Sequence, residues 1–241
     1  GVKRISPVDL PAIEVAVVLG GDGTILRAAE IVRLSSVPIL GVNLGRVGFL
    51  AEVEKFTMDD VAKSVVDKSY NTEERMMLSY SVHRNGKEVS TGFALNEVTV
   101  ERSGTAMVDL FLQIDSRPLS RWGCDGIICA TPTGSTAYAF SAGGPVLWPE
   151  VQALVLLPIA PHALFSRPMV VAPTSEIVIE IESNTALLSA DALRRFDLIE
   201  GDRVYIVRDA HIAKLAHVKA TTFTDRIVAK FKLPVEGWRG E

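Results

Sequence analysis

The sequence is poor in the residues that cross-link small secreted proteins or hold metal ions. It has two cysteines and four histidines in 241 residues. Cys124 and Cys129 lie an odd number of positions apart, so on one strand they would face opposite sides. We therefore expect neither a chelating pair nor a disulfide, and reduced packing residues instead. None of the histidines has metal-ligand spacing to another, so the metal ligands stay unknown.

Long apolar runs and a strong net charge are also missing. No run reaches the length of a membrane span, and no secretory signal is visible. The net charge of −4 argues against electrostatic binding of nucleic acid. The hydrophobic content of 48% can fill the core of one large domain or two small ones. We expect a cytoplasmic protein with neither nucleic acid nor membrane as partner.

The most informative stretch runs from Val15 to Leu26, VAVVLGGDGTIL. Its apolar start predicts a strand buried on both faces, as in a parallel sheet. The glycines allow a sharp turn and close approach to the backbone. The helix that follows points free N–H groups at this turn, which suits phosphate. A structural turn with a solvated Asp22 is the alternative, and the candidate phosphate contacts are Gly20, Gly21, Gly23 and Thr24.

The next residues continue an α/β pattern. We predict a helix over Thr24–Leu34 with Thr24 as N-cap, and a second buried strand over Pro38–Val42. A glycine-spaced loop follows over Gly41–Leu50, and Thr57-x-x-Asp60 resembles a capping box that opens a helix through Asp67. A doubly wound unit normally begins with a strand and a helix, and Gly1–Glu14 shows neither. We therefore expect that part of this domain is missing.

The hydrophobic period changes near Glu73 and becomes strand-like. The run Glu73-Glu74-Arg75 is interpreted as a solvated face, and Asn85-Gly86 predicts a β-hairpin turn. A final helix is predicted over Thr224–Phe231. This pattern predicts an α/β domain over 1–73 and a β-rich domain over 74–241. Further strands are predicted over Val108–Ile114, Gly126–Thr131, Ala153–Ile159, Ile177–Glu182 and Arg203–Val207.

Two polar stretches in the β-rich half are candidate binding segments. Thr131–Pro145 (TPTGSTAYAFSAGGP) is dense in small and hydroxyl residues that can approach ribose or amide groups. Its Tyr138 can stack on a ring, although a tight turn at a domain junction is an equally good interpretation. Asn96 and Glu97 interrupt a strand pattern. They can bind the edge of a base or a ribose, or they can form a solvent-facing edge.

Together these stretches resemble the NAD kinase family, also called inorganic polyphosphate/ATP–NAD kinases. The resemblance reaches nearly the full chain, and its C-terminus looks like actinobacterial members. GGDGT alone is shared with lipid kinases and related to phosphofructokinases, whereas TPTGSTAY with the preceding Asn-Glu pair is far more specific. The matching segments are Leu19–Leu26, Gly41–Leu50, Leu95–Glu97, Asp125-Gly126, Thr131–Pro145 and Pro161–Pro168.

The resemblance implies a Rossmann-like N-terminal domain, a β-rich C-terminal domain and an active site between them. It implies phosphoryl transfer to the adenosine-side 2′-hydroxyl of NAD, with Asp22 as the catalytic residue and a homodimer or homotetramer as the assembly. The donor is ATP or polyphosphate. The implied NAD-binding residues are Asp22, Gly23, Arg27, Phe49, Asn96, Glu97, Asp125, Thr136, Ala137, Tyr138 and Ser141.

The chemistry of the residues agrees with this family. A carboxylate within reach of a ribose hydroxyl can accept its proton, and glycine N–H groups, Mg²⁺ and Arg27 can stabilise the transferred phosphoryl group. Asp22 can instead orient the metal or the hydroxyl. Gly123 and Asp191-Ala192 depart from the pattern of many members, which puts fine contacts in doubt. A non-catalytic NAD(P)-binding sensor and a lipid kinase are the alternative functions.

Overall fold

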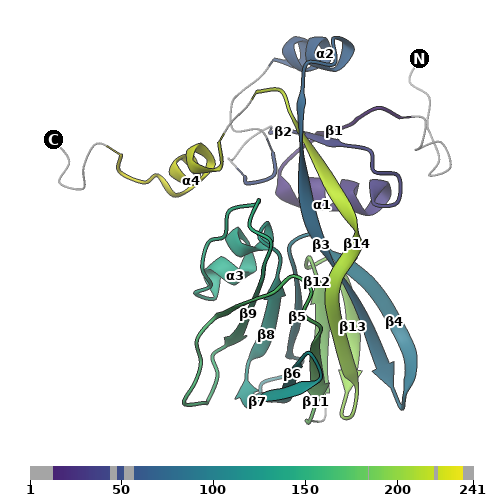
Figure 1. Ribbon diagram of the computed structural model, residues 1–241, viewed down its shortest axis with the longest axis vertical. Coiled ribbons are helices and arrows are strands. Elements are labelled where there is room, and N and C mark those ends of the chain that lie inside the picture. The colour runs from purple at the N-terminus through teal and green to yellow at the C-terminus, as the bar shows by residue number, and fades with distance from the viewer. Residues whose placement is uncertain (1–12, 44–47, 52–56, 184, 220–221, 236–241) are drawn as a thin grey trace. The chain divides into compact units, whose positions relative to one another are not determined.

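The computed structural model describes residues 13–43, 48–51, 57–183, 185–219 and 222–235 (Figure 1). The chain forms two compact units. The first contains the chain up to Arg75 and again from His211 onward, and the second runs from Met76 to Ala210. The sequence had placed everything after residue 73 in one β-rich domain. That assignment is wrong for the C-terminal segment, which returns to the first unit.

The first unit contains a small parallel sheet. Strand β1 (Ala16–Leu19) pairs with β2 (Ile39–Val42), and β2 pairs with the end of β14 (Arg203–His217). Helix α1 (Asp22–Val32) connects β1 to β2 and packs against both (Figure 1). Strand β2 is buried at every position, as predicted.

Strand β1 differs from the sequence prediction. Val18 is buried, but Val17 and Leu19 are 41% and 49% exposed. Alternate strand residues share a face, so one face of β1 is covered and the other is open. The prediction of burial on both faces is therefore wrong among the residues that the structure describes. Among the described residues, β1 pairs only with β2 and is an edge strand. The apolar composition of a strand does not reveal whether it lies at an edge.

The helix starts follow two different rules. Helix α1 begins at Asp22 with Gly21 as N-cap and no side-chain cap, so the predicted Thr24 cap is wrong. Helix α2 (Met58–Val66) begins at the predicted capping box of Thr57 and Asp60. Helix α4 (Phe223–Phe231) has the same box, made by Thr222 and Asp225, which the sequence analysis missed.

The second unit is built from antiparallel strands, as the β-rich pattern predicts. One sheet has six strands in the order β10-β9-β8-β5-β12-β13. Their bounds are Met169–Val171, Leu154–Ile159, Gly126–Ala130, Glu97–Arg102, Thr185–Ala190 and Arg194–Ile199. The other sheet contains β3 (Asn71–Arg84), β4 (Lys87–Ala94), β6 (Val108–Ile114), β7 (Arg117–Cys124), β11 (Ile177–Ile181) and the first part of β14.

The two sheets share one apolar core. Leu110, Trp122 and Ile179 from one sheet pack in the same cluster as Val100 and Leu188 from the other. Such burial is the main stabilising term in a β-sandwich. The predicted hairpin joins β3 to β4, and Asn85 and Gly86 have the positive φ values of 52° and 74° that this turn favours.

The two cysteines are free and buried, as expected. They lie on successive strands, Cys124 at the end of β7 and Cys129 in β8, and not on a single strand. Strand β7 was not predicted, because Pro118, Ser120 and Gly123 interrupt its apolar pattern. Burial raises the pKa of both thiols to about 12, so they stay protonated and unreactive.

Candidate functional site

Asp22 lies at the start of α1, immediately after the glycine turn. Its carboxylate oxygens accept hydrogen bonds from the backbone N–H groups of Phe49 at 2.9 Å and Leu50 at 3.1 Å. A Cβ at Gly48 would lie 2.1 Å from Asp22 Oδ1, so this approach requires glycine. The GGDGT and GFL stretches, separate in sequence, therefore form one local arrangement around a half-buried carboxylate.

The predicted phosphate-binding residues surround the same turn. Gly20 has a φ of 153°, and a Cβ there would lie 2.5 Å from the Thr24 hydroxyl. Gly21 and Gly23 are exposed, with nothing within 4 Å of where a Cβ would stand. Thr24 and Arg27 are exposed as well. The first turn of α1 thus presents an open backbone surface, and its N-terminus favours negative charge.

Phe49 was predicted as an NAD contact, but its ring is buried in the described structure. The side chain is only 8% exposed and packs against Phe223 and Phe231 of α4, with centroids 6.2 and 5.6 Å away. Its carbonyl accepts a hydrogen bond from Arg226 Nη1 at 3.4 Å. The backbone of Phe49 thus contacts Asp22, while its ring belongs to the packing of α4.

A buried polar cluster in the first unit was missed by the sequence analysis. Arg75, His217 and Arg226 are each at most 3% exposed, and all three approach Glu73. The hydrogen bond from His217, with Arg75 and Arg226 nearby, lowers the pKa of Glu73 to about 2 despite partial burial. The interpretation of this charge run as a solvated face is wrong for Glu73 and Arg75, whereas Glu74 is exposed. Glu73 and Arg75 lie two positions apart on β3, so their side chains share one face of the strand.

In the second unit, Asn96 and Glu97 are only 9% and 6% exposed. The carbonyls of Leu95 and Asn96 accept hydrogen bonds from Thr131, at 2.6 Å from its hydroxyl and 2.8 Å from its backbone N–H. A Cβ at Gly134 would lie 2.0 Å from the Asn96 carbonyl oxygen. The two candidate binding segments therefore pack against each other, and a solvent-facing edge is excluded for the Asn-Glu pair.

The Glu97 carboxyl group has an unusual environment. Burial, together with the nearby Asp191 and Glu101 carboxylates, raises its pKa to about 8, although a hydrogen bond from the Tyr138 backbone N–H acts in the opposite direction. Its Oε2 is buried and has no hydrogen-bond partner among the described residues. A buried oxygen without a partner is costly, so this atom is a good candidate for a ligand contact.

The other predicted contacts lie on short elements of the second unit. A 3₁₀ turn covers Gly134–Thr136, and helix α3 covers Tyr138–Ser141. Thr136 and Ala137 are half-buried, whereas Ser141 is exposed. The Tyr138 hydroxyl donates to Glu101 Oε2 at 3.2 Å, and its ring is 38% exposed.

Asp125 forms an ion pair that the sequence did not reveal. One carboxylate oxygen lies 2.8 Å from Nε of Arg102, at the end of β5. Arg102 also donates to the carbonyls of Gly104 and Thr105. The pair is half-exposed. Arg102 therefore offsets the charge of the Asp125 carboxylate and holds it in one orientation.

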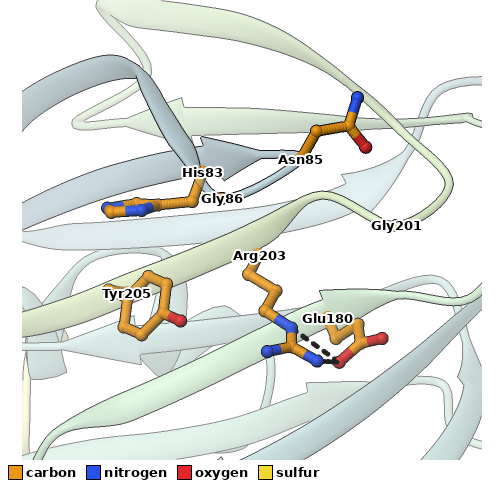
Figure 2. A pocket seen from close by; sticks show the side chains of 7 residues that line it. All are labelled: His83, Asn85, Gly86, Glu180, Gly201, Arg203 and Tyr205. Atoms are coloured by element: carbon orange, nitrogen blue, oxygen red, sulfur yellow. Dashed lines mark hydrogen bonds and ion pairs between the residues drawn. The ribbon is translucent and has the colours of Figure 1, made fainter.

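A cavity of about 210 Å³ opens at another edge of the second unit (Figure 2). Arg203 pairs with Glu180 at 2.9 Å, and the ring centroids of His83 and Tyr205 lie 4.8 Å apart. Figure 2 shows both pairs at the cavity. None of the predicted site residues lines this cavity. Its residues are His83, Asn85, Gly86, Glu180, Gly201, Arg203 and Tyr205.

The described residues contain no group of three or more His, Cys, Asp or Glu side chains placed to hold a metal ion. No helix in the described part of the chain is long and apolar enough to cross a membrane. Mg²⁺ is commonly held by one or two carboxylates together with substrate phosphates and water.

The glycine turn with its carboxylate in the first unit suits phosphate, and the buried Asn-Glu pair in the second unit suits ribose or base groups, which favours an enzyme that acts on a nucleotide. Family models for the ATP-NAD kinase N-terminal and C-terminal domains match residues 5–70 and 95–218. A protein of Streptomyces avermitilis described as NAD kinase 2 is 53% identical, over 99% of this chain and 80% of its own length.

Two solved structures have the same fold. A yeast NADH kinase complexed with NADH has a TM-score of 0.87 at 26% identity, over 95% of this chain and 69% of its own. An Archaeoglobus fulgidus NAD kinase in complex with ATP has a TM-score of 0.79 at 32% identity, over 96% and 87%. The chain therefore belongs to the NAD kinase family. The predicted enzyme class, a phosphotransferase with an alcohol acceptor, is confirmed by the family models and the curated relatives.

Proposed function

We propose that the enzyme transfers a phosphoryl group from ATP or polyphosphate to the adenosine 2′-hydroxyl of NAD, with Asp22 as general base. The observation that carries this role is the Asp22 carboxylate, held by two backbone N–H groups beside an open glycine turn. A fixed carboxylate can accept the hydroxyl proton as the oxygen attacks phosphorus. NADP and the shortened donor are the products.

The glycine turn is the proposed site for the donor phosphates. Open backbone at Gly21 and Gly23, together with the N-terminus of α1, suits phosphate oxygens, and Arg27 lies one turn further along the helix. Mg²⁺ carried by these phosphates would neutralise their charge. In this proposal the chain's own part is to position the phosphates and to accept the proton.

The proposed NAD contacts in the second unit centre on Asn96 and Glu97. The unpartnered Glu97 Oε2 can accept a hydrogen bond from a ribose hydroxyl, and the Asn96 amide can both donate and accept. Five further residues of the second unit are proposed to complete the set. They are Asp125, Thr136, Ala137, Tyr138 and Ser141, with Gly23 and Arg27 proposed from the first unit.

The proposal is tested by a matrix of acceptors and donors with the purified enzyme. NAD and NADH serve as acceptors, ATP and polyphosphate as donors, each with and without Mg²⁺. We expect NADP formation from NAD that depends on the divalent ion. Binding of NAD without NADP formation under every condition would overturn the proposed reaction. The two free, buried cysteines support a reducing compartment, and we propose the cytoplasm.

We also expect the enzyme to self-associate as a dimer or as a dimer of dimers. In the second unit Leu164 is fully exposed, and Phe165 and Trp148 are 56% and 47% exposed. Large apolar side chains exposed in this way favour burial against another chain, and a second copy is the proposed partner. Sedimentation at micromolar concentration measures the mass. A fully active monomer would contradict this prediction.

A further inference from the structure

The turn between β12 and β13 holds a buried carboxylate that no proposed role has used. Asp191 is 4% exposed and lies in the second unit with Asn96 and Glu97. Its oxygens accept hydrogen bonds from the backbone N–H groups of Leu95 at 2.9 Å and Asn96 at 2.7 Å. The backbone N–H of Glu97 also faces this carboxylate. One side chain thus gathers three consecutive amides.

The contact runs in both directions. The backbone N–H of Asp191 donates to the Glu97 carbonyl at 3.0 Å, and this bond continues the pairing of β12 with β5. The Asn-Glu segment is therefore fixed from two sides: by Asp191, and by Thr131, which donates to the Leu95 and Asn96 carbonyls. Such bonds restrict the backbone just where the two side chains leave it.

Arg194 fixes the carboxylate in turn. Its Nη1 lies 3.4 Å from Asp191 Oδ2 and donates to the Phe93 carbonyl at 3.2 Å. Its guanidinium carbon lies 3.7 Å from the centroid of the Phe93 ring. Asp191 and the neighbouring Ala192 both have left-handed φ values, 53° and 56°. A non-glycine pair rarely adopts this conformation, and here it directs the carboxylate at the three amides.

We propose that Asp191 is a positioning residue for NAD, whose carboxylate holds Asn96 and Glu97 in the conformation that binds the substrate. This inference rests on the proposed NAD-binding role of that pair. Asp191 does not touch the substrate and takes no part in the chemical step. Its loss should therefore raise the KM for NAD, and leave kcat and the KM for the donor nearly unchanged.

The decisive variant is Asp191→Asn, which keeps the shape of the side chain. An amide has one acceptor oxygen, whereas the Leu95 and Asn96 N–H groups now bond to different oxygens of Asp191. In the variant at least one of these two N–H groups would face an NH₂ group. We expect the KM for NAD to rise about tenfold, the scale for losing a hydrogen bond to a charged acceptor, with kcat changed less than about twofold.

The matched control is Asp202→Asn. Asp202 is also a buried carboxylate at a turn of the second unit, and it accepts from the Ile199 N–H and from Arg84. It has no contact with the Asn-Glu segment among the bonds that the structure describes. We expect this variant to lose thermal stability and to keep its KM for NAD. An equal rise in both variants would show general loosening and overturn the proposal.

The variant Glu97→Ala separates the two levels of inference. If Glu97→Ala raises the KM for NAD and Asp191→Asn leaves it within about twofold, only the role of Asp191 fails. If neither variant changes it, the proposed binding role of the pair fails first. If Asp191→Asn does not fold, Arg194→Lys tests the proposal instead. This variant keeps the positive charge and removes the planar guanidinium group that contacts Asp191. We then expect a smaller rise, about two- to fivefold, and no rise would reject the proposal.

Discussion

Replacing Asp22 with asparagine is expected to lower kcat by about two to four orders of magnitude, the usual scale for a general acid–base group. The amide keeps the size of the side chain and one acceptor for the Phe49 and Leu50 N–H groups, so the local fold should persist. What disappears is the basicity that receives the hydroxyl proton. Steady-state formation of NADP at saturating NAD and donor measures the loss, and circular dichroism checks the fold.

Two companion variants sharpen this test. Gly48→Ala retains the carboxylate but places a methyl group 2.1 Å from Oδ1, which is too close, so it should displace Asp22 and also lower kcat. Asp60→Asn changes a carboxylate of the same unit that only caps α2, and its turnover should match the wild type. Near-normal turnover of a folded Asp22→Asn enzyme would remove Asp22 from the chemistry.

Glu97→Ala is expected to weaken apparent NAD affinity by roughly tenfold to more than a hundredfold. Above the raised pKa of Glu97, about 8, the lost hydrogen bond is charge-assisted and costs about 1.5–3 kcal/mol, and about 1.4 kcal/mol is a factor of ten. The KM for the donor should change little, because its phosphates are proposed to bind at the glycine turn. Titrations of NAD at saturating donor, and of donor at saturating NAD, separate the two effects.

A surface glutamate provides the control for Glu97. Glu182 in the same unit pairs with Arg121 at 2.9 Å and has no proposed role, so Glu182→Ala should keep the NAD titration of the wild type. An unchanged NAD dependence in Glu97→Ala would mean that the buried pair is structural only. Its packing against Thr131 and Asp191 would then be its whole role.

The raised pKa of Glu97, about 8, predicts a pH dependence of NAD binding. The groups that face it are Asp191, Glu101 and Tyr138, and burial remains the largest cause. If the carboxylate form binds the ribose, affinity should rise with pH through this pKa, by about tenfold from pH 7 to pH 9. Glu97→Gln should abolish this rise. A flat KM for NAD in the wild type over this range would contradict the prediction.

The sequence by itself determined the local features. Asn85-Gly86 encodes a hairpin because both positions accept left-handed φ, and Thr57-x-x-Asp60 encodes a helix start because the two side chains satisfy each other's N–H groups. The glycine turn around Asp22 and the density of small residues after Thr131 could also be found in the sequence, because each is a run of consecutive residues. In each case a few consecutive residues carry the whole physical requirement.

Only the tertiary structure decided which polar groups are buried and which residues hold them. Asp191 accepts hydrogen bonds from the N–H groups of Leu95 and Asn96, which lie 96 and 95 positions earlier in the sequence. Arg226 donates to the carbonyl of Phe49, which lies 177 positions earlier. These contacts follow from strand order and register, which no local pattern specifies. The same reason made a solvent edge plausible for Asn96 and Glu97 and a solvated face plausible for Glu73 and Arg75. Burial is a property of what packs on a residue, and that partner lies far away in the chain.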